Sequence, residues 1–122
     1  MRIAMIDDEW AFLEIISLLL RKKGYDLFSF GDPQEFLEWL SDEKNKCPDL
    51  IITDLMMPYC TGSQMLEIIR SGKRCQGVPA ILISSMEETQ IDRRLFARFV
   101  PKSKIMMELA SAIDQTAGAG DG

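Results

Sequence analysis

Short runs of apolar residues alternate along this chain with stretches in which apolar residues recur every three or four positions. The short runs predict buried strands, and the periodic stretches predict amphipathic helices. The predicted strands cover residues 3–6, 27–30, 50–53, 80–83 and 99–100. Strands that alternate with helices are typical of a parallel sheet with helices on both faces. We therefore predict an α/β protein.

Capping residues indicate where the helices begin and end. Asp32 before Pro33 supplies an N-cap and a proline at the first helical position, and Gly24 ends the preceding helix. The helix signal is weakest in residues 87–98, where the apolar stripe is thin. We expect a fourth helix there that is short, about two turns, or irregular, and that is weakly held and mobile. The whole pattern predicts a doubly wound five-stranded parallel sheet with strand order 2-1-3-4-5.

Length and charge limit the kind of protein. A chain of 122 residues fits one domain, which we place at residues 1–117, with residues 118–122 as a flexible tail. No apolar run is long enough to span a membrane, and no signal-peptide core fits at the amino terminus. A net charge of −5 argues against nucleic-acid binding by this domain. We expect a cytoplasmic domain.

The cysteines and histidines narrow the chemistry further. The three cysteines, Cys47, Cys60 and Cys75, form neither an even framework nor a metal-binding spacing. We predict that all three are reduced, structural thiols. The chain has no histidine. This absence excludes Ser-His-Asp catalysis, zinc bound by histidine and an internal phosphohistidine.

Side chains suited to phosphate or metal chemistry follow every predicted strand except the second. In chain order they are Asp7 and Asp8, Asp54, Ser84 and Lys102. Ligands of doubly wound sheets bind beyond the carboxyl ends of the strands, so we expect these side chains to converge in one crevice. Three carboxylates this close together favour a hard divalent cation such as Mg²⁺. An ionised aspartate attacks a phosphoryl group without a general base, so we predict aspartyl phosphorylation.

At these positions the chain resembles the response-regulator receiver family. The resemblance rests on the acidic run that begins at Asp7, on residues 48–58 with Asp54 followed by Leu-Met-Met-Pro, and on Gly62 four residues after that proline. Ser84 and Lys102 complete it. The resemblance covers nearly the whole chain and implies a flavodoxin-like (βα)5 fold.

The resemblance also assigns roles to residues. It implies that Asp54 accepts the phosphoryl group and that Lys102 contacts it. It implies that Mg²⁺ is bound by Asp8, Asp54 and the backbone carbonyl of Met56, with Asp7 acting through water. The chain would then be a signalling switch and not an enzyme, since it would catalyse only its own phosphorylation and dephosphorylation.

Two further residues match the switch of the family. Ser84 matches the hydroxyl that shifts towards the phosphate, and Phe99 matches the aromatic ring that moves inward with it. The phosphodonor would be a partner histidine kinase or phosphotransfer protein, because this chain has no histidine to offer. The output partner is unknown, and a homodimer is left open.

The sequence departs from the family pattern at three places. Ser103 follows Lys102 where the family usually has proline, so the usual cis bond to proline is absent. The stretch between residues 84 and 99 is about one helical turn shorter than usual. Met56 and Met86 flank the site where many relatives have polar residues, which favours a long-lived phosphorylated state because neither side chain orients water.

Other interpretations stay open at this point. Asp7 and Asp8 could cap the first helix, and Phe99 could be an ordinary core aromatic. The shortened fourth-helix region keeps a phosphorylation-independent pseudo-receiver as the alternative function. An aspartyl phosphatase is disfavoured, because those enzymes generally have a second acid two residues after the nucleophile, where this chain has Met56.

Overall fold

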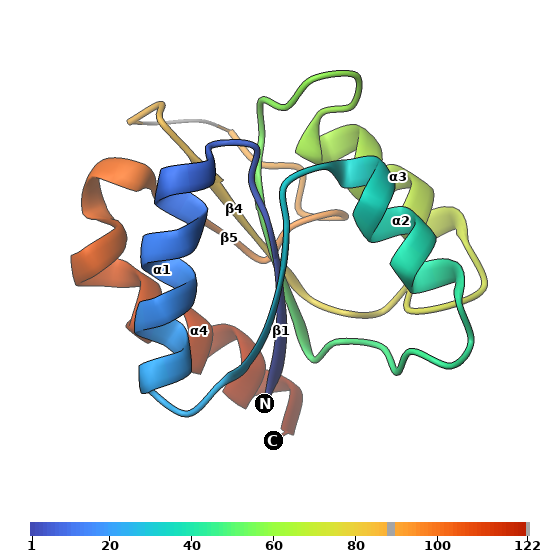
Figure 1. Ribbon diagram of the computed structural model, residues 1–122, viewed down its shortest axis with the longest axis horizontal. Coiled ribbons are helices and arrows are strands. Elements are labelled where there is room, and N and C mark those ends of the chain that lie inside the picture. The colour runs from blue at the N-terminus through green and yellow to red at the C-terminus, as the bar shows by residue number, and fades with distance from the viewer. Residues whose placement is uncertain (88–89, 122) are drawn as a thin grey trace.

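A computed structural model describes residues 1–87 and 90–121, with side chains described up to Thr116. It contains one parallel sheet with the strand order β2-β1-β3-β4-β5, which confirms the predicted fold class (Figure 1). The strands are β1 (Arg2–Ile6), β2 (Asp26–Phe30), β3 (Leu50–Asp54), β4 (Ala80–Ser84) and β5 (Arg98–Pro101). Every residue of β3 and β4 is buried, as expected for the middle strands of a sheet covered on both faces.

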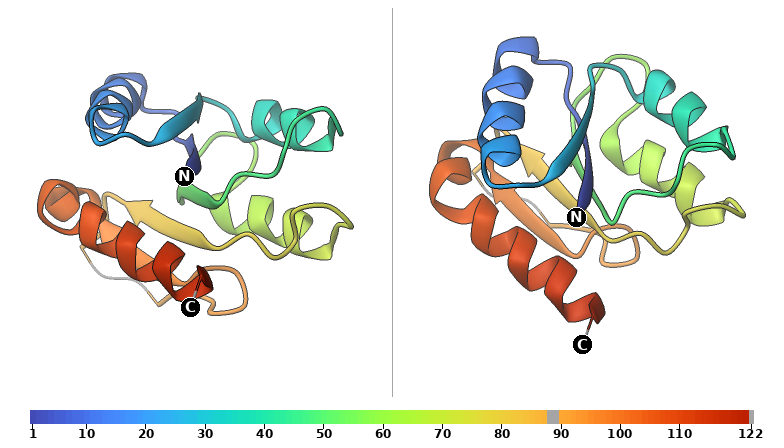
Figure 2. Two further views of the ribbon diagram at one scale, coloured as in Figure 1. Left: turned by 90° about the horizontal axis from the view of Figure 1, so that it is seen from below. Right: turned by 60° about the horizontal axis from the view of Figure 1, so that its bottom comes forward.

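Two helices cover each face of the sheet (Figures 1 and 2). On one face lie α1 (Trp10–Lys22) and α4 (Ile105–Asp121), the latter preceded by a 3₁₀ turn, Lys102–Lys104. On the other lie α2 (Pro33–Ser41) and α3 (Gly62–Ser71). The core is accordingly divided into two clusters, one on each side of the sheet.

The helix boundaries follow from local capping. Asp32 accepts a hydrogen bond from the Gln34 backbone N–H (2.8 Å), which confirms the predicted N-cap of α2. Gly24 has a φ of +96° after α1, a conformation that suits glycine. Thr61 and Gln64 form a capping box at the start of α3, directly after the loop that follows β3. This cap fixes where α3 begins relative to Asp54.

The crossover from β4 to β5 departs from the expectation of a two-turn helix. Its described residues form bends and a turn at residues 93–95, with no helix among them, so only the irregular form of the prediction is confirmed. The expected helix start includes Glu88 and Thr89, which lie outside the described residues. The second half is anchored and not weakly held: Leu95 is 5% and Phe96 2% exposed, both in the cluster beneath α2 and α3.

An arginine of α3 helps to hold this segment in place. The Arg70 guanidinium donates to the backbone carbonyls of Leu95 (2.8 Å), Val78 (2.6 Å) and Gln76 (2.7 Å). Leu95 and Phe96, which the expected helix would have carried, are instead buried in the core cluster without a helix around them. The predicted mobility of the segment stays a prediction.

The prediction of three reduced cysteines is wrong for two of them. Cys47 and Cys75 form a disulfide with a Cα–Cα distance of 5.6 Å, and Cys60 is free. Cys47 lies in the α2–β3 connection and Cys75 in the α3–β4 connection. The pair is 28 residues apart in sequence, and only the parallel arrangement of β3 and β4 brings the two connections together.

The carboxyl-terminal prediction is not tested. Side chains after Thr116 and all of Gly122 lie outside the described part of the chain, so the domain boundary at residue 117 and the flexible tail 118–122 stay predictions. Among the described residues, no helix is both long and apolar enough to cross a membrane.

Candidate functional site

Strand register brings the predicted site residues to one edge of the sheet. Ile6 of β1 pairs with Thr53 of β3, so Asp7 emerges beside Asp54. Further along the sheet, Ser84 of β4 pairs with Pro101 of β5, directly before Lys102. The predicted convergence beyond the carboxyl ends of the strands is therefore present.

Three aspartates form the centre of this site. Asp7, Asp8 and Asp54 each offer a carboxylate oxygen, and these oxygens all lie within 4.8 Å of one another. Asp7 is 0% and Asp54 6% exposed, whereas Asp8 is open to solvent. Oxygen donors of this kind at this spacing fit a hard divalent cation. The arrangement leaves one exposed carboxylate through which a cation can reach the two buried ones.

Lys102 contributes a positively charged side chain to this acidic site. Its Nζ lies 2.8 Å from Asp7 Oδ2 and 3.6 Å from Asp54 Oδ2, and its side chain is 11% exposed. Glu9 Oε1 accepts a hydrogen bond from the same ammonium at 3.3 Å. The Phe12 ring lies beneath it, with its centroid 4.5 Å from Nζ. One ammonium thus faces three carboxylates and an aromatic ring.

The charges at this site are poorly balanced. Burial, reinforced by the negative charge of Asp7, raises the pKa of Asp54 to about 6. Burial also raises the pKa of Asp7, against the lowering effect of Lys102. Burial alone would lower the pKa of Lys102, but its hydrogen bond to Asp7 and the nearby carboxylates leave that pKa raised. The site has more negative charge than Lys102 neutralises, which is what a cation-binding site requires.

Backbone groups hold the two buried carboxylates in place. Asp7 Oδ1 accepts the Glu9 backbone N–H at 2.8 Å, and Asp54 Oδ1 accepts that of Leu55 at 3.0 Å. The N-cap residue of α1 is Glu9, and its side chain makes no capping bond. The alternative that Asp7 and Asp8 serve as the helix cap therefore receives no support from this geometry.

The loop after Asp54 needs the glycine that the motif places there. A Cβ at Gly62 would lie 2.3 Å from the Asp54 carbonyl oxygen, a contact that no side chain can make. The Gly62 N–H donates to the Leu55 carbonyl at 2.8 Å. The absent side chain lets α3 begin directly against the site.

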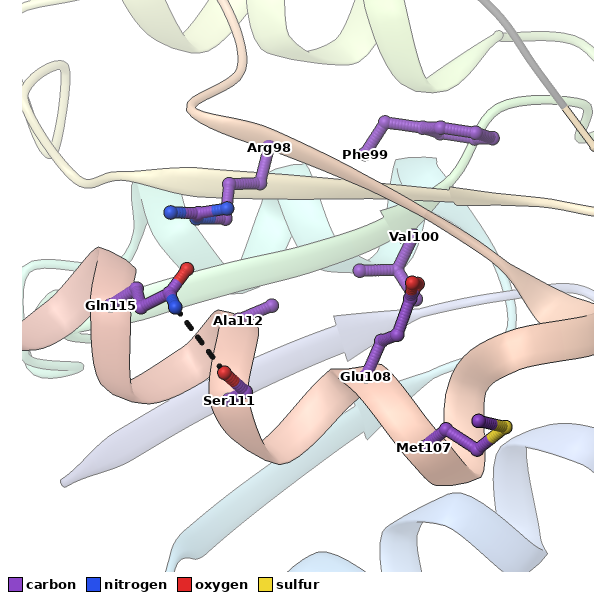
Figure 3. A pocket seen from close by; sticks show the side chains of 8 residues that line it. All are labelled: Arg98, Phe99, Val100, Met107, Glu108, Ser111, Ala112 and Gln115. Atoms are coloured by element: carbon purple, nitrogen blue, oxygen red, sulfur yellow. Dashed lines mark hydrogen bonds between the residues drawn. The ribbon is translucent and has the colours of Figure 1, made fainter.

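Ser84 and Phe99 occupy positions compatible with their predicted roles. Ser84 is 1% exposed, and its Oγ accepts the Met86 backbone N–H at 3.1 Å. Phe99 is half-buried and packs against the core cluster beneath α2 and α3. Figure 3 shows its ring on the side of β5 away from α4, whereas Arg98 and Val100 point towards that helix. The roles of both residues as a switch stay predictions.

Met56 and Met86, which the sequence places beside the site, are exposed, 66% and 49%. Two further contacts of Lys102, those with Glu9 and Phe12, were not predicted from the sequence. Glu9 belongs to the acidic run that begins at Asp7, and Phe12 is an apolar residue of the helix that ends before Gly24. Both residues follow β1 closely, so they lie at the same edge of the sheet as Lys102, which follows β5. This position is the sequence signal that could have identified them.

Comparison with known proteins identifies the family. The family model of the response regulator receiver domain matches residues 3–113. This chain therefore belongs to the response regulator receiver family, whose members act in two-component signalling, and the predicted resemblance is confirmed. The family is not a classical enzyme family.

Curated relatives are longer than this chain. It is 28% identical over 88 residues to the DNA-binding response regulator MtrA of Mycobacterium tuberculosis, covering 72% of this chain and 36% of that protein. It is 29% identical over 91 residues to the two-component response regulator-like protein APRR9 of Arabidopsis thaliana, covering 75% and 19%. The chain thus spans about a third or less of the length of these relatives.

Solved structures agree with the fold. The response regulator TrrA of Thermotoga maritima, solved in complex with Mg²⁺-BeF, has a TM-score of 0.78 and 25% identity, with 93% of this chain and 96% of that chain covered. A Francisella receiver domain reaches a TM-score of 0.83 at 21% identity, with 98% of each chain covered.

Proposed function

We propose that this domain is a phosphorylation-dependent switch that accepts a phosphoryl group on Asp54 and, in response, changes a partner-binding surface. The observation that carries the proposal is the buried Asp54 carboxylate, clustered with Asp7 and Asp8 within 4.8 Å and faced by the Lys102 ammonium at 3.6 Å. An acidic site with its own fixed cation suits a nucleophile whose product is a dianion.

Asp54 would attack as the carboxylate. With a pKa of about 6 it is largely ionised at neutral pH even before a cation binds. Its oxygen would form the new bond to phosphorus while the bond from phosphorus to the donor nitrogen breaks, and the departing imidazole would take up a proton from solvent. Lys102 would hold the phosphoryl oxygens, and the Ser84 hydroxyl would donate to one of them.

The donor set fits Mg²⁺. The oxygens would come from Asp8, Asp54 and the Met56 backbone carbonyl, with Asp7 acting through water. Bound there, Mg²⁺ would neutralise the charge that develops on the phosphoryl oxygens. Two observations support this: the aspartate oxygens share one site, and burial holds the pKa values of Asp7 and Asp54 high in the absence of a cation.

The donor would be a histidine kinase or a histidine phosphotransfer protein. The structure of the response regulator TrrA in complex with the histidine kinase ThkA supports this class of partner, at 25% identity to this chain and a TM-score of 0.79. Because such donors are charged from ATP inside the cell, we also propose a cytoplasmic location. The domain would turn over no substrate other than its own acyl phosphate.

The test is phosphorylation by acetyl phosphate, followed by intact mass. The wild-type chain should gain one phosphoryl group with Mg²⁺ and none with EDTA. Asp54→Asn should gain none, whereas the matched control Asp26→Asn, which changes an exposed aspartate of β2, should label like the wild type. Labelling of Asp54→Asn at the wild-type level would refute the assignment. A folded wild type that never labels would instead favour the pseudo-receiver.

A further inference from the structure

The two paired cysteines lie at the edge of the sheet opposite the acidic site. The connections that carry Cys47 and Cys75 run from the carboxyl ends of α2 and α3 to the amino ends of β3 and β4 (Figure 1). The site described above lies at the carboxyl ends of these strands. Cys47 is half-buried and Cys75 is 9% exposed, so the Cys47 side is the more accessible to a reagent.

A guanidinium lies beside one of the two sulfur atoms. Nη1 of Arg74 lies 3.7 Å from Cys75 Sγ. A neighbouring cation stabilises a thiolate relative to a thiol, and a stabilised thiolate leaves faster in thiol–disulfide exchange. Cys75 is therefore the sulfur best suited to leave when the bond opens.

The two connections are joined by more than the disulfide. The Arg74 guanidinium also donates to the backbone carbonyls of Leu40 and Asn45, in α2 and the connection that follows it. Arg70 donates to carbonyls of Gln76 and Val78 in the connection that carries Cys75. The acceptors of these bonds are carbonyl oxygens and not the sulfur atoms. Opening the disulfide would thus leave the two cysteines close enough to pair again.

We propose that Cys47–Cys75 is a reversible redox site, reduced by low-molecular-weight thiols and closed by low-molecular-weight disulfides. In a reducing cell, a disulfide in a protein of this kind is more often transient than structural. Closing the bond makes a covalent ring of residues 47–75, which includes β3, Asp54 and α3. The closed ring would limit the motion of β3 and α3. The oxidation state of the cysteine pair would therefore change the flexibility of the segment that carries Asp54.

The exchange proceeds in balanced steps. An external thiolate attacks the Cys47 sulfur, a mixed disulfide forms there, and Cys75 leaves as a thiolate beside Arg74. A second external thiolate attacks the outer sulfur of the mixed disulfide, releasing Cys47, which takes up a proton, and a low-molecular-weight disulfide. Two external thiols are oxidised for each protein disulfide reduced, and closure is the reverse.

Maleimide labelling and intact mass in glutathione buffers of graded ratio test the proposal on the full chain. Reduced wild type should take three labels and oxidised wild type one, with a reversible transition between them and unchanged circular dichroism. Oxidation should raise the melting temperature by about 10 °C. The control Cys60→Ser should show the same transition, with one label fewer in each state. Unfolding on reduction at 25 °C, or failure to reclose, would overturn the proposal.

Single variants test the order of attack. Cys75→Ser should trap a glutathione adduct on Cys47, whereas Cys47→Ser should give little adduct on Cys75. The rate of reduction by glutathione should fall about tenfold in Arg74→Gln, recover in Arg74→Lys and change little in Lys73→Gln. Equal rates in Arg74→Gln and Lys73→Gln would contradict the role given to Arg74, and the wild-type titration still decides reversibility if Arg74→Gln does not fold.

Discussion

The two edges of the sheet are built in opposite ways. At the carboxyl ends of the strands, Asp7, Asp8 and Asp54 are crowded together, and Lys102 contacts the two buried ones. Burial raises the pKa values of Asp7 and Asp54, and the negative charges of Asp7 and Asp8 raise that of Asp54 further. At the amino ends, guanidinium hydrogen bonds and a disulfide join the connections. The domain thus concentrates destabilising charge where a ligand can neutralise it, and it places its cross-links at the opposite edge of the sheet.

Removing the lysine should have the largest effect on this balance. Lys102→Met should lower the free energy of unfolding by about 3 kcal/mol in metal-free buffer at pH 8, because it leaves the buried Asp7 charge without its partner. Urea denaturation followed by circular dichroism measures this. The control Lys104→Met changes an exposed lysine nearby and should cost less than about 0.5 kcal/mol. Equal losses in the two variants would show that the acidic edge does not depend on Lys102.

The acidic edge should also make stability depend on pH. The folded pKa of Asp54 is about 6, against an ordinary value of 3.8, so its contribution is full below about pH 4 and is lost as the pH rises through 6. Asp7, raised in the same way, acts in the same direction. Without metal, the free energy of unfolding should fall by about 2 kcal/mol between pH 4 and pH 8.

Urea denaturation across this pH range provides the measurement. Saturating Mg²⁺ should flatten the dependence, because it binds the carboxylates that repel. In Asp54→Asn the dependence should shrink. If the metal-free domain is more stable at pH 8 than at pH 5, the pH dependence has the opposite sign. That result would contradict the proposal that crowded carboxylates destabilise this edge.

A smaller effect is expected from the exposed member of the cluster. The Asp8 charge contributes to the raised pKa of Asp54, although it is a lesser cause than burial and Asp7. Asp8→Asn should therefore raise the melting temperature by a few degrees without metal, worth about 0.5–1 kcal/mol, and weaken Mg²⁺ binding about tenfold. Thermal melts with and without Mg²⁺ check both. A variant that melts lower in EDTA would mean that Asp8 supports the fold.

The smallest effect is expected on the lifetime of the phosphorylated state. Met56 and Met86 are exposed and offer no group to orient water. Replacing Met56 with Asn and Met86 with Glu should speed loss of the acyl phosphate several-fold, about one kcal/mol of barrier. The decay of the phosphorylated mass after removal of acetyl phosphate gives the rate. An unchanged decay would mean that the methionines do not set the lifetime.

Much of this architecture is predictable from sequence because it depends on short-range signals. The strands are runs of apolar residues, and Asp32 followed by Pro33 marks the start of α2. The carboxylates of the site come directly after their strands. Once the strand order is assumed, Asp7, Asp54 and Lys102 must converge. Their convergence needs no knowledge of side-chain conformation.

The predictions failed where contacts between distant segments decide the structure. Residues 87–98 were expected to form a short helix, but Leu95 and Phe96 are buried without one, and Arg70 donates a hydrogen bond to the Leu95 carbonyl. The pairing of Cys47 with Cys75 depends on two connections whose proximity only the folded sheet creates. Neither contact leaves a periodic trace in the sequence.

Hydrogen exchange with and without Mg²⁺ and beryllofluoride tests most directly whether the acidic edge is a switch. Thermal stabilisation that requires both reagents and is absent in Asp54→Asn would first establish that the site is filled. The account then predicts that protection changes around Asp54 and in residues 90–97 of the crossover, while the connections at residues 42–49 and 72–79 stay as they were. Strong protection of residues 90–97 before activation, unchanged once the site is filled, would contradict it.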